Sequence, residues 1–123
     1  MIIIPTLHCG GRCEEAISLY KEAFNLIVDW QGKDKDTNLI YHTEAHIGKQ
    51  RIRLSDGGVE QVKIQVDSLF LAVVFDTVAE VEGAFNILKE GGTIIQEPHK
   101  PDFATFMSEL KDRFGFKWVL MVD

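Results

Sequence analysis

Residues 69–92, LFLAVVFDTVAEVEGAFNILKEGG, contain a complete strand and helix and decide the fold. The apolar run at residues 69–75 is typical of a buried strand. Thr77 and Glu80 form the Thr-x-x-Glu capping box that starts a helix, and apolar residues then recur at helical spacing until a Gly-Gly pair ends it. Strand patterns follow this helix over residues 93–97, 103–110 and 116–122.

The first half of the chain has the same order of elements. The predicted helix spans residues 13–24, with its apolar residues on one face, and Asn25 can end it in a left-handed conformation. Strands are predicted over residues 2–8, 26–30, 39–47 and 51–55, with a charged loop over residues 32–38. Gly48 and Gly115 occupy the same turn in each half, which indicates a duplication.

The repeat predicts an α+β fold of two βαβββ modules within a single domain of 123 residues. The modules span about residues 1–58 and 68–123. One helix covers one face of each small sheet, so the other face needs a partner. We expect the sheets to meet around a shared concavity with the helices outside, as a half-barrel-like concave sheet, within one chain or across a homodimer. Residues 59–66 alternate like a strand but also suit a covering loop.

Composition limits the expected partners. The chain has 13 Lys and Arg against 19 Asp and Glu, and no basic stripe, so no nucleic acid and no anionic membrane is expected as a partner. No apolar run approaches the ~20 residues that span a bilayer, and residues 1–4 lack the pattern of a secretion signal. Two cysteines do not make a disulfide framework, so a cytoplasmic location is expected.

Five motifs link the chain to a known family. They are GRCEEAISLY (11–20), HTEAHIG (42–48), LSD (54–56), LKEGG (88–92) and DRFGFKW (112–118). In this order they resemble the vicinal oxygen chelate superfamily, which includes glyoxalase I, bleomycin-resistance proteins, fosfomycin-resistance proteins and extradiol dioxygenases. The PhnB-like branch is the most similar. The chain departs from that branch at Cys13, where relatives often have Ala, and at residues 103–105, where they tend to carry Phe-Trp-Gly.

The resemblance implies where a metal would lie. The superfamily's metalloenzymes hold a divalent metal with His and Glu side chains from paired strands, and these positions fall on Pro5, Arg53, Phe70 and Val119. None of these side chains is a metal ligand, and a shift of one residue offers nothing better than Thr6. The family's metal chemistry is therefore expected to be absent, with no cofactor, and Phe70 and Val119 are expected to form an apolar floor.

Strand alternation gathers polar residues on one face of the first sheet. His42, Glu44 and His46 share one face of their predicted strand, and Arg51 and Arg53 share a face of the next. Pointing into the concavity, Arg53 would bind the carboxylate or phosphate of a small ligand, and His42 with Glu44 would move a proton. The alternative is that these charges neutralise one another at a half-solvated face or a dimer seam.

Other residue groups allow further interpretations. The alternating histidines and carboxylate at residues 42–46 also suit a metal site, although alternate side chains of a strand lie about 7 Å apart. His8, Cys9 and Cys13 are soft ligands without a fourth partner, and burial between helix and sheet explains both cysteines. Tyr41 is expected on the apolar face of its strand. The larger aromatic residues, mostly core with some lining the cavity, are Trp30, Phe70, Phe103, Phe106, Phe114, Phe116 and Trp118.

Three functions fit these patterns. The first is a metal-free small-molecule-binding protein similar to the PhnB-like branch, with no reaction assigned. The second is a lyase or isomerase that acts on a small polar metabolite through His42, Glu44 and Arg53, and the third is a metalloenzyme with a relocated site. The ubiquinone methyltransferase label attached to this branch is not supported, because no glycine-rich nucleotide loop follows the first strand. The predicted ligand-binding residues are His42, Glu44, His46, Arg51, Arg53, Phe70 and Val119.

Overall fold

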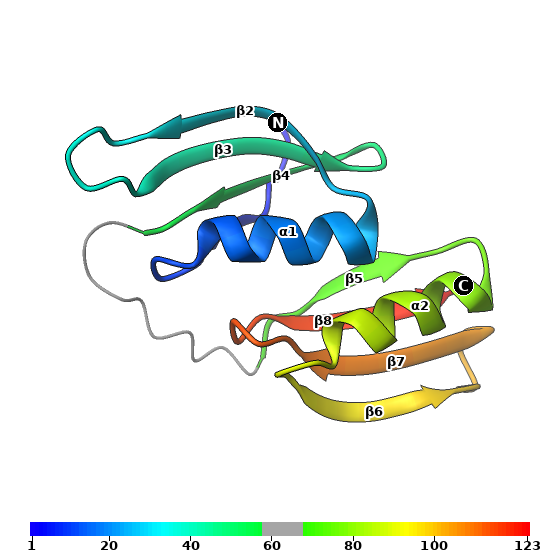
Figure 1. Cartoon of the computed structure of the whole chain (residues 1–123). Helices are drawn as coiled ribbons and strands as arrows, with labels where there is room; N and C mark the ends of the chain where they lie inside the picture. Colours follow the sequence, from blue (N-terminus) through cyan, green and yellow to red (C-terminus); the bar gives the residue numbers. More distant parts are fainter. Residues whose placement is uncertain (58–67) are drawn as a thin grey trace. The chain divides into compact units, whose positions relative to one another are not determined.

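The computed structural model describes residues 1–57 and 68–123 (Figure 1). The chain divides into two compact units, Met1–Lys63 and Ile64–Asp123. In the described residues, each unit contains one helix and one four-stranded mixed sheet, in the order strand, helix, three strands. The predicted α+β class with a repeated βαβββ order is confirmed. The stretch 59–66, compatible with a strand or a loop, lies outside the described residues.

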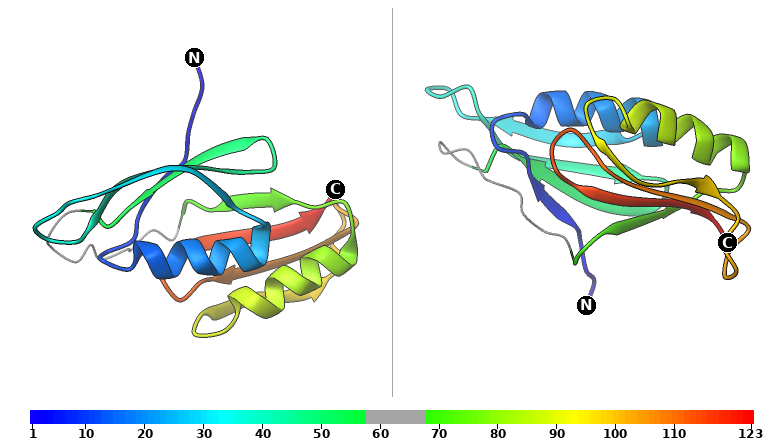
Figure 2. Two further views of the ribbon diagram at one scale, coloured as in Figure 1. Left: turned by 45° about the horizontal axis from the view of Figure 1, so that its top comes forward. Right: turned by 90° about the horizontal axis from the view of Figure 1, so that it is seen from below.

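The first unit builds a four-stranded sheet, here sheet A, with the strand order β1-β4-β3-β2. Its elements are β1 (Thr6–His8), α1 (Cys13–Phe24), β2 (Ile27–Lys33), β3 (Ile40–Ile47) and β4 (Gln50–Ser55). β1 runs parallel to β4, and the other pairs are antiparallel. β1 is shorter than the predicted strand 2–8, because Pro5 has no N–H and Met1, Ile2 and Ile3 are exposed. In Figure 2 the N-terminal end extends beyond the sheet.

Helix α1 packs its apolar face on sheet A, where it contacts β3 and β4. Its buried residues include the whole predicted apolar face: Cys13, Ala16, Ile17, Leu19, Tyr20, Ala23 and Phe24. Sheet A contributes buried residues that alternate along its strands: Leu7, Thr43, Ala45, Ile52 and Leu54. Asn25 ends the helix in the predicted left-handed conformation, with a φ of 56°.

Two β-bulges interrupt the pairing of β2 with β3. One makes Asp29 an extra residue of β2, and the other makes Tyr41 an extra residue of β3. A bulge reverses the alternation of side chains locally, so Tyr41 is exposed, which corrects its predicted place on the apolar face with Thr43. β2 also runs beyond its predicted end to Lys33, because β3 pairs with it as far as Ile40.

The second unit builds sheet B, with the strand order β5-β8-β7-β6. Its elements are β5 (Leu71–Val74), α2 (Val78–Leu88), β6 (Thr93–His99), β7 (Phe106–Lys111) and β8 (Lys117–Val122). The predicted capping box starts α2: the Thr77 side chain accepts the N–H of Glu80 at 3.2 Å, and its hydroxyl donates to the Glu80 carboxylate at 2.9 Å. α2 contacts β7 and β8, and its predicted apolar face is buried.

Three details of the second unit differ from the sequence predictions. Pro98 lies within β6 rather than ending it, because β6 is an edge strand in which a missing N–H is tolerated. β7 starts three residues later than predicted, since Phe103 lies in a bend and is 74% exposed. Trp30 and Phe70, expected mostly in the core, are about half exposed, whereas Phe114 and Trp118 are buried.

Two buried carboxylates organise the main chain around them. The side chain of Arg12 does not cap the start of α1. The cap comes instead from Asp56, 43 residues later in the sequence, whose carboxylate accepts the N–H of Cys13 at 2.8 Å. Asp56 also accepts the N–H of Ile40 at 2.6 Å and so joins α1 to the start of β3. In the second unit, Asp112 closes the turn between β7 and β8. Within residues 1–57 and 68–123, no helix is long and apolar enough to span a membrane.

Candidate functional site

The candidate site lies on the face of sheet A whose side chains alternate with the buried residues beneath α1. We call it the charged face and define it by Trp30, His42, Glu44, His46, Arg51 and Arg53. The register places Glu44 of β3 between Trp30 of β2 and Arg53 of β4. His46 is paired with Arg51 one step further along. The period of two along β3 and β4 therefore assembles the predicted residues of the first unit on one surface.

Glu44 is the centre of the charged face. Its Oε1 accepts a hydrogen bond from Nε of Arg53 at 2.7 Å, and its Oε2 accepts one from Nη2 of Arg51 at 3.2 Å. Nε2 of His42 lies 3.0 Å from Oε1. The hydrogen bond with His42, followed by those from Arg51 and Arg53, lowers the pKa of Glu44 to about 2 against the opposing effect of desolvation. Because the ionised carboxylate only accepts hydrogen bonds, Nε2 of His42 is the protonated ring nitrogen.

The two guanidinium groups keep donors that Glu44 does not use. Arg53 donates to Glu44 only through Nε, and Arg51 only through Nη2. Their side chains are 37% and 49% exposed, so the remaining N–H groups are accessible from solvent. Two cations beside one carboxylate leave a local excess of positive charge on a chain whose net charge is −6. This arrangement suits a small anion that accepts several hydrogen bonds.

Glu44→Gln is expected to lower the unfolding temperature at pH 7 and to have a much smaller effect near pH 2. The pKa of Glu44 in the folded protein, about 2, lies below its ordinary value of 4.5. The ionised carboxylate therefore stabilises the folded state above pH 4.5, and this contribution is lost as the pH falls towards 2. Circular dichroism melts of both proteins across this range measure the effect, with Glu22→Gln on the exposed face of α1 as the matched control. A constant difference in unfolding temperature would contradict the assignment.

His46, His8 and the two cysteines, the other candidate residues of the first unit, do not join the cluster around Glu44. Nδ1 of His46 lies 2.8 Å from Oδ2 of Asp29, so His46 does not share the carboxylate of Glu44. Cys9 and Cys13 are buried, as expected of residues between helix and sheet, whereas His8, the third soft ligand of the alternative interpretation, is exposed. Among the described residues, no three His, Cys, Asp or Glu side chains group in a way that would hold a metal ion.

The four positions implied by the resemblance lie in different environments. The carbonyl of Pro5, directly before β1, accepts the backbone N–H of Arg53 in β4 at 2.9 Å, so these two positions are neighbours. In the second unit, Val119 is buried in β8, and Phe70 precedes β5 with Nζ of Lys117 5.6 Å from its ring centroid. An apolar ring, an apolar branch, a proline and a guanidinium do not fit a divalent metal.

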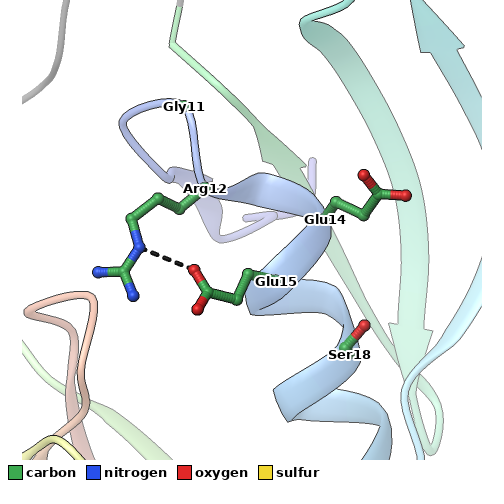
Figure 3. A pocket seen from close by; sticks show the side chains of 5 residues that line it. All are labelled: Gly11, Arg12, Glu14, Glu15 and Ser18. Atoms are coloured by element: carbon green, nitrogen blue, oxygen red, sulfur yellow. Dashed lines mark hydrogen bonds and ion pairs between the residues drawn. The ribbon is translucent and has the colours of Figure 1, made fainter.

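A shallow hollow of about 380 Å³ lies at the start of α1 (Figure 3). Its lining residues are Gly11, Arg12, Glu14, Glu15 and Ser18. Nε of Arg12 donates to the Glu15 carboxylate at 2.8 Å, and Figure 3 shows the Glu14 side chain on the opposite side of the helix start from Arg12. Two carboxylates oppose an anion here, and the charged face is the stronger candidate. No sequence signal predicts this hollow, since acidic residues in a first helical turn are explained by the helix dipole.

Comparisons with known proteins agree with this fold. A family model described as the Glyoxalase/Bleomycin resistance protein/Dioxygenase superfamily matches residues 3–120. The PhnB protein of Bacillus cereus has a similar structure, with a TM-score of 0.89, 20% identity and full coverage of both chains. Protein PA1353 of Pseudomonas aeruginosa has a TM-score of 0.83 and 25% identity, covering 100% of this chain and 98% of that one.

A third similar structure holds a metal and a small acid. It is the fosfomycin resistance protein FosX of Listeria monocytogenes, complexed with Mn(II) and 1S,2S-dihydroxypropylphosphonic acid. Its TM-score is 0.73 at 14% identity, covering 100% of this chain and 92% of that one, so the likeness concerns the fold alone. No curated protein matches the chain significantly.

Proposed function

The chain belongs to the glyoxalase/bleomycin resistance protein/dioxygenase superfamily, and from this premise we propose that it binds a small anionic ligand on the charged face of sheet A without a metal. The observation that supports this function is the pair of guanidinium groups beside Glu44, with N–H donors left for a ligand. Small-molecule binding is the common property of the superfamily. The anionic ligand and the absence of a metal are specific to this proposal.

The metal-free part of the proposal rests on side-chain chemistry. A divalent ion needs oxygen, nitrogen or thiolate donors, and Pro5, Phe70 and Val119 offer none. At the fourth position Arg53 brings a positive charge. A relocated site around Glu44 is equally unsuitable, because two guanidinium groups already bind that carboxylate and repel a divalent cation.

The anionic part rests on the hydrogen-bonding capacity of Arg53. Its planar guanidinium is held by Glu44 through Nε, which fixes its orientation before a ligand arrives. Carboxylates and phosphates match the fork of N–H groups that remains on such a side chain. The net charge of the chain is −6, so long polyanions are repelled and the ligand is small.

The test is a calorimetric titration with benzoate, propionate, inorganic phosphate and methylphosphonate. Arg53→Gln is expected to weaken binding of the acids that bind by about tenfold or more, since a hydrogen bond to a charged group contributes about 1.5–3 kcal/mol. Arg12→Gln is the matched control, because it removes the same charge at the hollow beside α1. Loss of binding in Arg12→Gln with retention in Arg53→Gln would move the site to that hollow and overturn the proposal.

Elemental analysis tests the metal-free part separately. Protein purified without a chelator is expected to contain no stoichiometric divalent metal. One bound metal ion for each chain would overturn this part of the proposal.

We also propose that the protein is a cytoplasmic homodimer, as in related cavities completed by two chains. A monomer in light scattering at micromolar concentration would contradict the dimer.

A second function, a lyase or isomerase reaction on a small polar metabolite, is favoured by the 3.0 Å contact between His42 and Glu44. Glu44, whose pKa is about 2, is a weak base near neutral pH. In this function His42 transfers the proton, Glu44 orients its ring and Arg53 binds the substrate. The rate is expected to be largely lost in His42→Gln, because glutamine cannot transfer the proton. Inertness towards a panel of small polar acids would exclude this reaction class.

A further inference from the structure

Aromatic rings form the part of the charged face that lies nearest β2. Trp30 and Tyr41 are 51% and 59% exposed, which is unusual for large aromatic side chains. The ring centroid of Trp30 lies 6.1 Å from that of Tyr41 in an edge arrangement and 6.1 Å from that of His42. We call Trp30, Tyr41 and His42 the aromatic shelf. The shelf presents flat apolar surface beside a charged cluster.

The backbone leaves room for this shelf. Gly32 pairs with His42 across the two strands, between the bulges that displace Asp29 and Tyr41. A Cβ atom on Gly32 would collide with the ring of Tyr41 and would lie 2.7 Å from the ring of Trp30. The absence of a side chain at this position therefore allows both rings to lie over the β2 strand. A bulge and a glycine together place the rings where regular alternation would not.

The aromatic shelf and the guanidinium groups are within reach of one small molecule. Trp30 is the cross-strand neighbour of Glu44 on one side, and Arg53 is its neighbour on the other. Two strand spacings separate Trp30 from Arg53, about 10 Å between backbones, which long side chains of both residues shorten. His42 links the two groups, since it contacts Glu44 and lies beside Trp30.

We propose that the ligand is a planar aromatic acid, with its ring stacked on Trp30 and its acid group bound by Arg53. This inference rests on the proposed function and specifies the ligand class of the same site. A flat ring covers the exposed indole face and gains a stacking contact, whereas a puckered aliphatic ring of the same size does not. The acid group uses the donors of Arg53 that Glu44 leaves available.

The experiment compares benzoate with cyclohexanecarboxylate, two acids of equal charge and similar size that differ in planarity. In the wild-type protein benzoate is expected to bind about fivefold more tightly, as a stacking contact of typical strength predicts. Trp30→Leu is expected to abolish this preference, because it removes the flat ring on which benzoate stacks. Trp30→Phe retains a flat ring and most of the preference. Gly32→Ala, which displaces the rings of Trp30 and Tyr41, is expected to reduce it as well.

Fluorescence provides a second measurement. The chain has two tryptophans, and Trp118 is 1% exposed, so quenching by an added aromatic acid reports on Trp30. Equal affinities for the two acids, or a preference that survives Trp30→Leu, would overturn the inference while Arg53→Gln still weakens both acids and upholds the proposed function. Failure of both acids to bind the wild-type protein, with phosphate or methylphosphonate still bound, would overturn the inference alone, whereas failure of every acid of both experiments would overturn the proposed function as well.

Discussion

Asp112→Ala is expected to destabilise the protein by about 3 kcal/mol, the loss typical of several buried hydrogen bonds to one charged group. Oδ1 of Asp112 accepts the backbone N–H groups of Phe114 at 2.9 Å and Phe116 at 3.0 Å. Its Oδ2 accepts the indole N–H of Trp118 at 2.8 Å. Asp112 and Trp118 are 3% and 1% exposed, so water does not readily replace the lost acceptor.

Urea unfolding monitored by circular dichroism measures this loss. Asp112→Asn is expected to cost less than Asp112→Ala, because the amide oxygen still accepts backbone hydrogen bonds while its nitrogen does not accept the one from Trp118. The matched control is Asp102→Ala, an exposed aspartate of the same unit, for which a change within about 0.5 kcal/mol is expected. A loss below about 1 kcal/mol in Asp112→Ala would mean that the turn keeps its shape without the carboxylate.

Gly92→Ala is expected to destabilise the protein by about 2 kcal/mol, because the added Cβ atom overpacks the junction between α2 and β7. The new atom would collide with the backbone carbonyl of Lys111 and would lie 3.1 Å from the carbonyl oxygen of Leu88 and 3.2 Å from Cα of Asp112. These are main-chain atoms, which cannot rotate away as the end of a side chain can. The backbone must move instead, and sheet B moves with it.

The matched control is the same substitution at Gly83, in the middle of α2. A Cβ atom there would have no neighbour within 4 Å, so only the helical preference of alanine over glycine remains. Gly83→Ala is therefore expected to stabilise the protein by about 1 kcal/mol. The two variants should shift the unfolding midpoint in urea in opposite directions. Shifts of the same sign would show that the junction at Gly92 adapts.

The elements that were predicted correctly are those whose signals come from residues close together in the sequence. The helix over residues 13–24 and the capping box of Thr77 and Glu80 are both confirmed, because helix periodicity and caps involve residues a few positions apart. Strand ends were less accurate. They depend on where a partner strand continues, as at Lys33, and on whether a strand lies at an edge, as at Pro98.

The candidate site was likewise predictable where it depends on local sequence, and not where it depends on strand pairing. Alternation along one strand placed His42 and Glu44 on one face, and the confirmed hairpin brought Arg53 beside them. The exposure of Trp30 and Tyr41 was not predictable, because it follows from bulges in the pairing with a second strand. Likewise, nothing near Cys13 in the sequence indicates that Asp56 caps its helix, since the two residues meet only in the folded unit.

The parallel pairing of β1 with β4 constrains the order of events during synthesis. Strands β2, β3 and β4 are consecutive and antiparallel, so they can pair as soon as they leave the ribosome. In contrast, Thr6 of β1 cannot pair until Arg53 of β4, its partner 47 residues later in the sequence, has been synthesised. Closing so long a loop costs entropy that only late contacts repay. The first strand of sheet A to emerge is thus expected to be the last to pair, and the edge of β4 that it covers stays open until then.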